Sequence, residues 1–152
     1  MTQWEKNLAQ LGLTLPPVVA PVAAYIPAIR TGSLVYTSGQ VPFVDGQLSA
    51  TGKVGAEVSL EQAEKAAELC ALNAIAAVHD LVGLDAVVRI VKVVGFVASA
   101  PGFTDQPQVI NGASRLLGAV FGDAGVHARS AVGVAELPLG APVEVELIAE
   151  VR

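Results

Sequence analysis

The chain has 152 residues, 53% hydrophobic and 15% charged, so it can bury a core and is too hydrophobic for intrinsic disorder. Spanning a bilayer takes about 20 consecutive apolar residues, and the longest candidate, residues 17–29, is broken by prolines. The net charge is −5 and the basic residues are scattered, which argues against a nucleic-acid partner. We therefore expect a cytoplasmic protein of one domain, residues 1–152, whose surplus apolar surface is buried between subunits.

Hydrophobic periodicity and turn signals divide the chain into helices and strands. The expected elements are a helix at 3–11, a proline-rich lead to residue 22, strands at 23–30 and 34–37, a loop at 39–58, a helix at 60–82, a strand at 87–98, a helix at 106–121, and strands at 129–136 and 143–151. Ser59 and Gln62 form a capping box at the start of the longest helix. After the short first helix, the order β-β-α-β-α-β-β predicts an α+β fold, one sheet with two long helices on one face.

The last two strands carry the candidate chemistry. If their valine-rich faces meet the helices, a second set of residues lies on the helix-free face of the sheet: Arg129, Ala131, Gly133, Glu144, Glu146, Ile148 and Glu150. We expect Arg129 and Glu144 to lie on adjacent strands and on this same face. The small apolar residues around them indicate a subunit interface that encloses a polar site.

Arg129 and Glu144 suit the binding of a small carboxylate ligand and general acid or base chemistry beside it. The planar guanidinium of arginine matches a carboxylate in a way that lysine does not. A partly desolvated glutamate can hold a water molecule and move protons. The alternative, left open by the sequence, is a structural salt bridge between two strands.

The sequence gives little support for a nucleotide site, a nucleophilic catalytic site or a metal site. The sequence has no glycine-rich phosphate loop and no Ser-His-Asp or Cys-His pattern. The single Cys70 excludes an internal disulfide, and His79 and His127 match no metal-ligand spacing. We therefore expect no metal site. Ser38, at the end of a predicted strand, can equally be a turn residue.

Two segments resemble motifs of the Rid (reactive intermediate deaminase) superfamily, also called the YjgF family. RSAVGVAELPLGAPVEVELIAE, residues 129–150, is similar to its C-terminal signature, and VYTSGQVP, residues 35–42, is similar to a second motif. The order of elements agrees over essentially the whole chain after about residue 22. The N-terminal helix, the proline-rich lead and Ala23-Ala24 in place of Gly-Pro indicate a divergent branch.

The resemblance implies a chorismate-mutase-like fold and a homotrimer whose sheets form a central barrel, with ligand sites in clefts between subunits. In this family Arg129 would bind the substrate carboxylate and Glu144 would position the attacking water. Tyr25 and Ser38 would line the cleft, and Asn111 is a looser match that can equally be a helical surface residue. The reaction implied is hydrolysis of a reactive 2-imino or enamine acid to a 2-keto acid and ammonia, without a cofactor.

Two alternatives to the deaminase follow from the same residues. Because Arg129 alone suffices to capture a carboxylate, the protein can also be a non-enzymatic trimer that binds a small carboxylate metabolite. Ribonuclease activity, often ascribed to this family under the name endoribonuclease L-PSP, is disfavoured by the acidic net charge.

Overall fold

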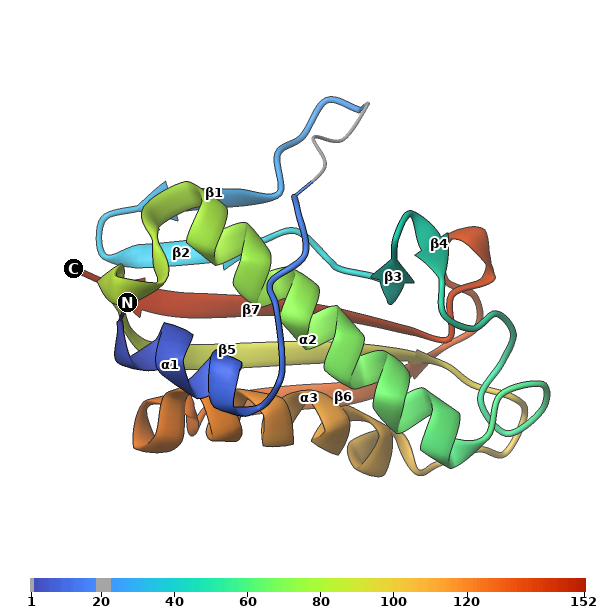
Figure 1. Ribbon diagram of the computed structural model, residues 1–152. Helices are drawn as coiled ribbons and strands as arrows, with labels where there is room; N and C mark the ends of the chain where they lie inside the picture. Colours follow the sequence, from blue (N-terminus) through green and yellow to red (C-terminus); the bar gives the residue numbers. More distant parts are fainter. Residues whose placement is uncertain (1, 19–22) are drawn as a thin grey trace.

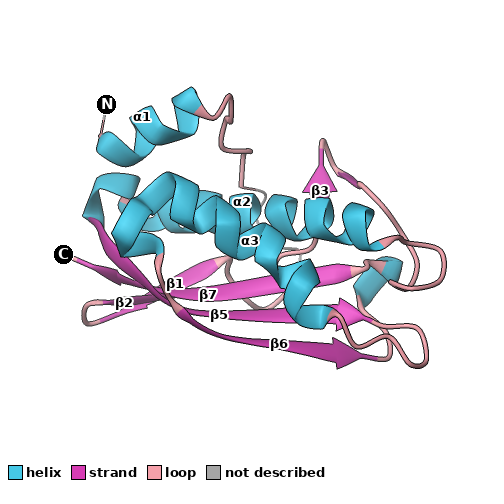
Figure 2. Cartoon of the chain, turned by 90° about the horizontal axis from the view of Figure 1, so that it is seen from below, coloured by secondary structure: helices cyan, strands magenta, loops and turns pink. Residues whose placement is uncertain are grey.

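The computed structural model describes residues 2–18 and 23–152 (Figure 1). Its helices and strands are α1 (Gln3–Gln10), β1 (Ala28–Thr31), β2 (Leu34–Thr37), β3 (Phe43–Val44), β4 (Gln47–Leu48), α2 (Leu60–Val82), β5 (Val87–Ala98), α3 (Gln106–Phe121), β6 (Ala128–Val134) and β7 (Val143–Val151). A five-stranded sheet of order β1-β2-β7-β5-β6 forms one layer, and α2 and α3 cover one face of it (Figure 2). Within the described part, no helix is both long and apolar enough to cross a membrane.

The predicted order of strands and long helices is confirmed, and α2 begins at the predicted capping box. Strand β1 is shorter than expected and starts only after Pro27, which has no N–H to donate to a ladder. The expected loop at 39–58 contains a small hairpin, β3–β4, around Asp45-Gly46. Both turn residues have positive φ, as a type I′ turn requires. Residue 1, and residues 19–22 of the expected proline-rich lead, lie outside the described residues.

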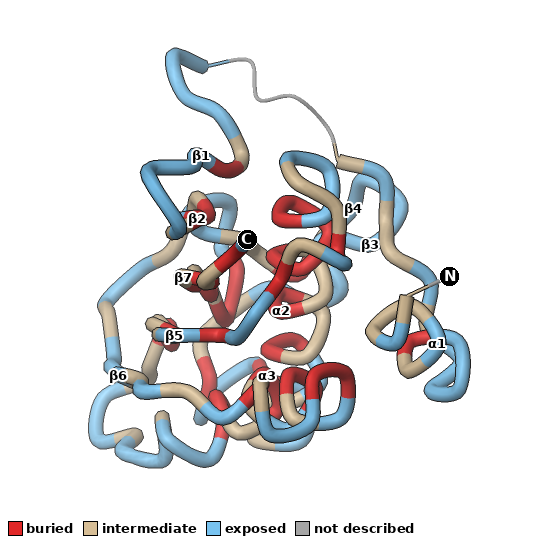
Figure 3. Tube along the Cα trace, turned by 90° about the vertical axis from the view of Figure 1, so that its left-hand side faces the viewer, coloured by how far each residue is buried: buried red, intermediate tan, exposed pale blue. Residues whose placement is uncertain are grey.

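The core lies between the sheet and the two long helices (Figure 3). Small side chains on α2, among them Ala67, Cys70 and Ala74, are fully buried. Small residues also bring the two helices together, because a Cβ at Gly112 of α3 would lie 2.1 Å from the backbone oxygen of Glu64 on α2. The two long helices therefore pack in close contact over the sheet.

The opposite face of the sheet, here called the open face, is not covered by any helix of the described residues (Figure 2). Large apolar side chains are exposed on it from several strands: Ile29 of β1 is 56% exposed, Tyr36 of β2 40% and Val132 of β6 43%. Charged residues such as Glu144 and Glu146 of β7 lie between them. The strand at 87–98, expected to be covered on both sides, is therefore covered by helices on one side only within this chain.

Candidate functional site

Arg129, near the start of β6, is held by the first turns of α3. Its Nη1 donates hydrogen bonds to Oδ1 of Asn111 at 2.9 Å and to Oγ of Ser114 at 3.1 Å. Its Nη2 donates to the carbonyl oxygen of Pro107 at 3.1 Å. These acceptors recur at spacings of four and three residues, so they share one face of the helix. We call Arg129, Asn111, Ser114 and the Pro107 carbonyl the Arg129 cluster.

All three acceptors in the Arg129 cluster are neutral. The ion pairs within residues 2–18 and 23–152 join Lys53 to Glu136, Lys65 to Glu68 and Arg115 to Glu64, and none involves Arg129. The guanidinium is thus oriented by its own chain without being neutralised by a carboxylate. This arrangement suits an anionic ligand, because a carboxylate adds charge-assisted hydrogen bonds to a preorganised donor.

The expectation that Arg129 and Glu144 share a face on adjacent strands is wrong. Strand β5 lies between β6 and β7, so the two residues are on strands that do not touch. Arg129 pairs in register with Val93, which is fully buried under the helices, whereas Glu144 aligns with Phe96 on the open face. Arg129 and Glu144 therefore lie on opposite faces of the sheet.

The same register reverses the orientation predicted for the whole of β6. Ala131 and Gly133 face the helices, and Val132 and Val134 face away. The reason is the close approach of α3 to this edge strand: a Cβ at Gly133 would lie 2.8 Å from Nε2 of Gln106 and 3.0 Å from Oγ of Ser99. Close to Gln106 and Ser99, the helix side of β6 therefore carries the small residues Ala131 and Gly133, and Val132 and Val134 lie on the open face.

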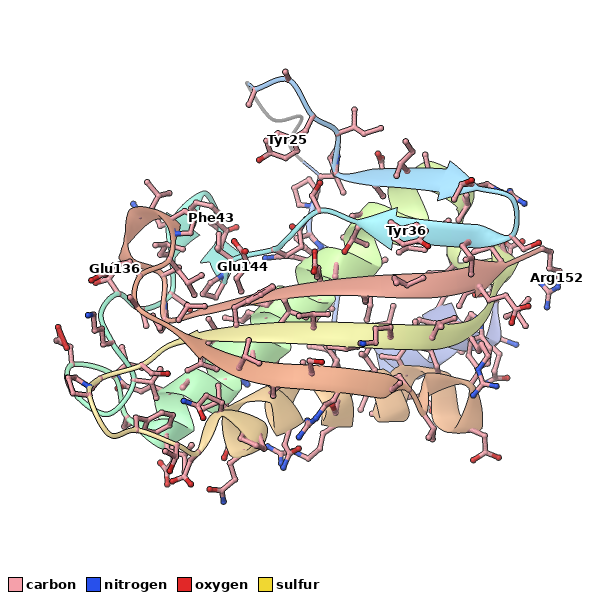
Figure 4. All side chains as sticks on the ribbon, turned by 180° about the vertical axis from the view of Figure 1, so that it is seen from behind. Tyr25, Tyr36, Phe43, Glu136, Glu144 and Arg152 are labelled. Carbon is pink, nitrogen blue, oxygen red and sulfur yellow. The ribbon has the colours of Figure 1, made fainter. Side chains whose placement is uncertain are left out.

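Glu144 packs against the backbone that follows β2. Gln40 and Val145 exchange two backbone hydrogen bonds, of 2.8 and 2.9 Å, which place Gly39 beside the Glu144 side chain. A Cβ at Gly39 would lie 2.8 Å from both Cδ and Oε2 of Glu144, so the glycine leaves room for the carboxyl group. We call Gly39 and Glu144, together with Ser38 next to Gly39 in the chain, the Glu144 cluster. Figure 4 labels Glu144.

Burial raises the pKa of the Glu144 carboxyl, and the like charge of Glu146 raises it further. A glutamate with a raised pKa is a better proton donor and acceptor near neutral pH than an ordinary surface glutamate. The environment of Glu144 thus suits the exchange of a proton with water or with a substrate.

Ser38 ties the segment before β1 to the end of β2. Its Oγ donates a 2.6 Å hydrogen bond to the carbonyl oxygen of Ile26, and its N–H donates to the carbonyl oxygen of Pro27 at 2.8 Å. Tyr25, just before this anchor, is 59% exposed and projects from the segment (Figure 4). The hydroxyl proton of Ser38 therefore has a structural partner, and the Tyr25 ring is open to contacts from outside the chain.

The structure brings some of the predicted site residues together and separates others. Asn111, the loosest of the sequence matches, contacts Arg129 directly. Ser114 and Gly39 were not predicted, although the spacing of Asn111 and Ser114 places them on the same face of a helix. No signal in the sequence indicates the contact between Gly39 and Glu144, because it depends on a pairing between distant segments.

Neither Cys70 nor the side chains that could hold a metal form a further candidate site within the described residues. Cys70 is fully buried, its Sγ contacts the carbonyl oxygen of Val143 at 3.5 Å, and burial raises the pKa of its thiol, which disfavours the nucleophilic thiolate. Among the described residues, no group of three or more His, Cys, Asp or Glu side chains is placed to hold a metal ion.

Comparison with known proteins gives consistent matches over nearly the full chain. The family described as "YjgF/chorismate mutase-like, putative endoribonuclease" matches residues 5–151. Protein TCP17 of Trypanosoma cruzi is 44% identical over 148 residues, which are 96% of this chain and 92% of TCP17. These matches confirm the resemblance noted in the two sequence motifs.

Solved structures agree with this assignment. Atu1372 of Agrobacterium tumefaciens, a protein of unknown function, is 46% identical with a TM-score of 0.92, over 99% of this chain and 93% of its own. E. coli TdcF, crystallised with bound serine, is 26% identical with a TM-score of 0.63, over 88% of this chain and 91% of its own. The predicted chorismate-mutase-like α+β fold is confirmed.

Proposed function

Since this chain belongs to the YjgF/chorismate mutase-like family, we propose that it hydrolyses small 2-imino or enamine acids to 2-keto acids and ammonia. The observation that carries the proposal is the Arg129 cluster, a guanidinium oriented by three neutral acceptors with no carboxylate paired to it within the described residues. Its natural complement is the carboxylate of the substrate. The serine bound to TdcF is a small amino acid with such a carboxylate, which supports this ligand class.

Glu144 supplies the proton transfers in this proposal. Water adds to the electrophilic imine carbon as Glu144 accepts its proton, and a carbinolamine forms. Glu144 then gives the proton to the nitrogen, the C–N bond breaks and ammonia leaves, and the carbonyl forms as the hydroxyl proton of the carbinolamine passes to Glu144. The raised pKa of Glu144 favours both halves of this transfer near neutral pH. No metal or cofactor takes part, because the iminium carbon is already electrophilic.

The site is proposed to form between chains. Arg129 and Glu144 lie on opposite faces of one sheet, so a single ligand meets both only if they come from different subunits. Arg129 lies on the edge strand β6, at the border of the chain, and Glu144 lies on the apolar open face. A homotrimer that buries the open faces would bring the border of one chain to the face of the next. Tyr25, exposed in the single chain, would then line the cleft.

A coupled assay tests the activity. The protein is mixed with an enzyme that releases 2-aminoacrylate or 2-iminobutyrate, and keto-acid formation is followed against buffer. We expect wild-type protein to accelerate it and Arg129→Ala to abolish the acceleration. Arg115→Ala serves as the matched control, because Arg115 is an exposed arginine of α3 that pairs with Glu64 instead. A wild-type rate equal to buffer across several imino acids would exclude the enzyme.

A second candidate function is binding of a small carboxylate metabolite without catalysis. The Arg129 cluster favours it, because this cluster is complete within one chain and does not need Glu144. In that case serine or a 2-keto acid binds the wild-type protein and not Arg129→Ala, while the coupled assay shows no acceleration. Glu144→Gln separates the two functions, since it should leave binding unchanged and remove catalysis.

A further inference from the structure

The side chain of Asn73, on α2, donates two hydrogen bonds to the backbone that follows the Glu144 cluster in the chain. Its Nδ2 donates to the carbonyl oxygen of Val41 at 3.0 Å and to that of Phe43 at 3.2 Å. An amide nitrogen carries two N–H donors, so both are used on this one segment. In Figure 4 Phe43 and Glu144 lie toward the same end of the sheet. Asn73 therefore connects the helix layer to the backbone beside a candidate catalytic group.

In the described part, residues 41–43 are hydrogen-bonded to the helix layer through Asn73 alone. Their other hydrogen bonds, including those of the β3–β4 ladder, stay within residues 41–49. Pro42, at the centre of the segment, has no N–H to donate. Without Asn73 the segment would therefore keep its local turn and lose its hydrogen bonds to α2.

The segment that Asn73 holds continues directly into the residues that contact Glu144. Gln40 exchanges two backbone hydrogen bonds with Val145, and a Cβ at Gly39 would lie 2.8 Å from Cδ and Oε2 of Glu144. The backbone at Gly39 is thus already as close to the carboxyl group as a glycine allows. A shift of the adjoining residues would change this contact.

Helix α2 also contacts the strand that carries Glu144. Sγ of Cys70 contacts the carbonyl oxygen of Val143, the residue before Glu144, at 3.5 Å. Cys70 and Asn73 are three residues apart, so they lie on the same face of the helix. One face of α2 therefore contacts both backbone segments that lie beside the Glu144 carboxyl group.

We propose that Asn73 is a positioning residue for Glu144, which holds residues 41–43 and, through them, the Gly39 backbone against the carboxyl group. This contact limits the access of water to the carboxyl group, and the partial desolvation that suits Glu144 to proton transfer depends on it. The inference rests on the proposed function, because the position of Glu144 affects a reaction only if imine hydrolysis takes place. The contact itself can be measured without a reaction.

Titration of Glu144 in Asn73→Ala tests the proposal without a substrate. The full-length protein is labelled with ¹³C, and the carboxyl signal of Glu144, assigned by its loss in Glu144→Gln, is followed against pH. We expect the raised pKa of Glu144 to fall toward that of an exposed glutamate, because the loosened segment admits water. The like charge of Glu146 and the thiol of Cys70, whose own pKa Glu144 raises, are present in both proteins and do not account for the difference.

Kinetics in the coupled assay provide a second readout. We expect kcat of Asn73→Ala to fall by about 10- to 100-fold, as for a misplaced catalytic group. KM should stay the same, because Arg129 still binds the substrate carboxylate. If the wild-type protein shows no activity, the proposed function fails, and the titration of Glu144 alone decides the role of Asn73.

Asn7→Ala is the matched control. Asn7 also joins two elements through its side-chain amide, since its Nδ2, on α1, donates to the carbonyl oxygen of Val120 on α3 at 2.7 Å. Asn7→Ala should lower the stability of the protein and leave both kcat and the titration of Glu144 unchanged. Asn73→Leu keeps most of the side-chain volume without a donor. It should reproduce the effects of Asn73→Ala, and it takes the place of that variant if the alanine prevents folding.

A pKa of Glu144 that is the same in wild type and in the Asn73 variants would overturn the proposal, even if the stability of the variants falls, because Asn73 would then have a structural role only. An unchanged kcat in an active protein would overturn it as well.

Discussion

At the scale of the residue, Arg129 is a charged group oriented by its own chain and left without a counter-ion in the described part. A matched substitution tests whether this free charge matters. Asn111→Asp keeps the shape of the side chain and places a carboxylate 2.9 Å from Nη1 of Arg129. The new ion pair competes with a ligand carboxylate, so we expect serine or substrate affinity to fall by about tenfold or more while the protein remains folded. Unchanged affinity, measured by calorimetry, would contradict a role for the charge of Arg129.

The raised pKa of Glu144 predicts that the stability of the protein depends on pH. Because its pKa is raised in the folded state, its contribution to stability is present below the unfolded pKa, about 4.3, and is lost as pH rises through the folded value. Glu144→Gln should therefore be more stable than wild type at about pH 7, and the difference should shrink toward about pH 4. Urea unfolding at several pH values measures this.

Glu146→Gln provides the control for this titration. Removing the like charge lowers the pKa of Glu144 and should reduce the pH dependence that Glu144 contributes. A difference between wild type and Glu144→Gln that does not change with pH would show that the carboxyl titrates normally.

The sequence predicted which residues form the two clusters better than it predicted their orientation. The chemistry of Arg129, Glu144 and Asn111 is visible in residue type and motif. The face of β6 is not, because an edge strand beside a close helix reverses the usual pattern: Gly133 turns inward and Val132 outward. Such a reversal depends on the register with β5, which periodicity within one strand does not contain.

At the scale of the element, the contact between α2 and α3 depends on one glycine. A Cβ at Gly112 would lie 2.1 Å from the backbone oxygen of Glu64, so Gly112→Ala must push the helices apart. Overpacking of this kind costs about 1–3 kcal/mol, and urea unfolding should show it. Gly118→Ala, in the same helix, meets nothing within 4 Å and should instead stabilise by about 0.5–1 kcal/mol. Equal effects of the two substitutions would contradict this packing.

Long elements were predicted better than short ones. Helices α2 and α3 and strands β5 and β7 lie at the predicted positions because their periodicity or β-branched composition runs over the whole element. The β3–β4 hairpin was missed, since two residues per strand provide no periodicity and only Asp45-Gly46 indicated a turn. Strand β1 was predicted too long because the apolar residues before Pro27 resemble a strand.

At the scale of the whole molecule, the low charge content of the chain is explained by the open face of the sheet. Apolar side chains are exposed on the open face, and two of them, Tyr36 and Val132, lie toward opposite edges of the sheet. A patch that extends across a sheet is typical of a subunit interface. The predicted homotrimer would bury this face and would join the Arg129 cluster of one chain to the Glu144 cluster of another.

Subunit complementation tests this central claim most directly. Arg129→Ala and Glu144→Gln are each expected to be inactive alone, and the two are refolded together in equal amounts, with light scattering to check for three times the chain mass of 15.5 kDa. If each site takes Arg129 and Glu144 from different subunits, about a quarter of the sites regain both residues, and keto-acid release returns in that proportion. A mixed trimer with no more activity than the separate variants would contradict a site shared between chains.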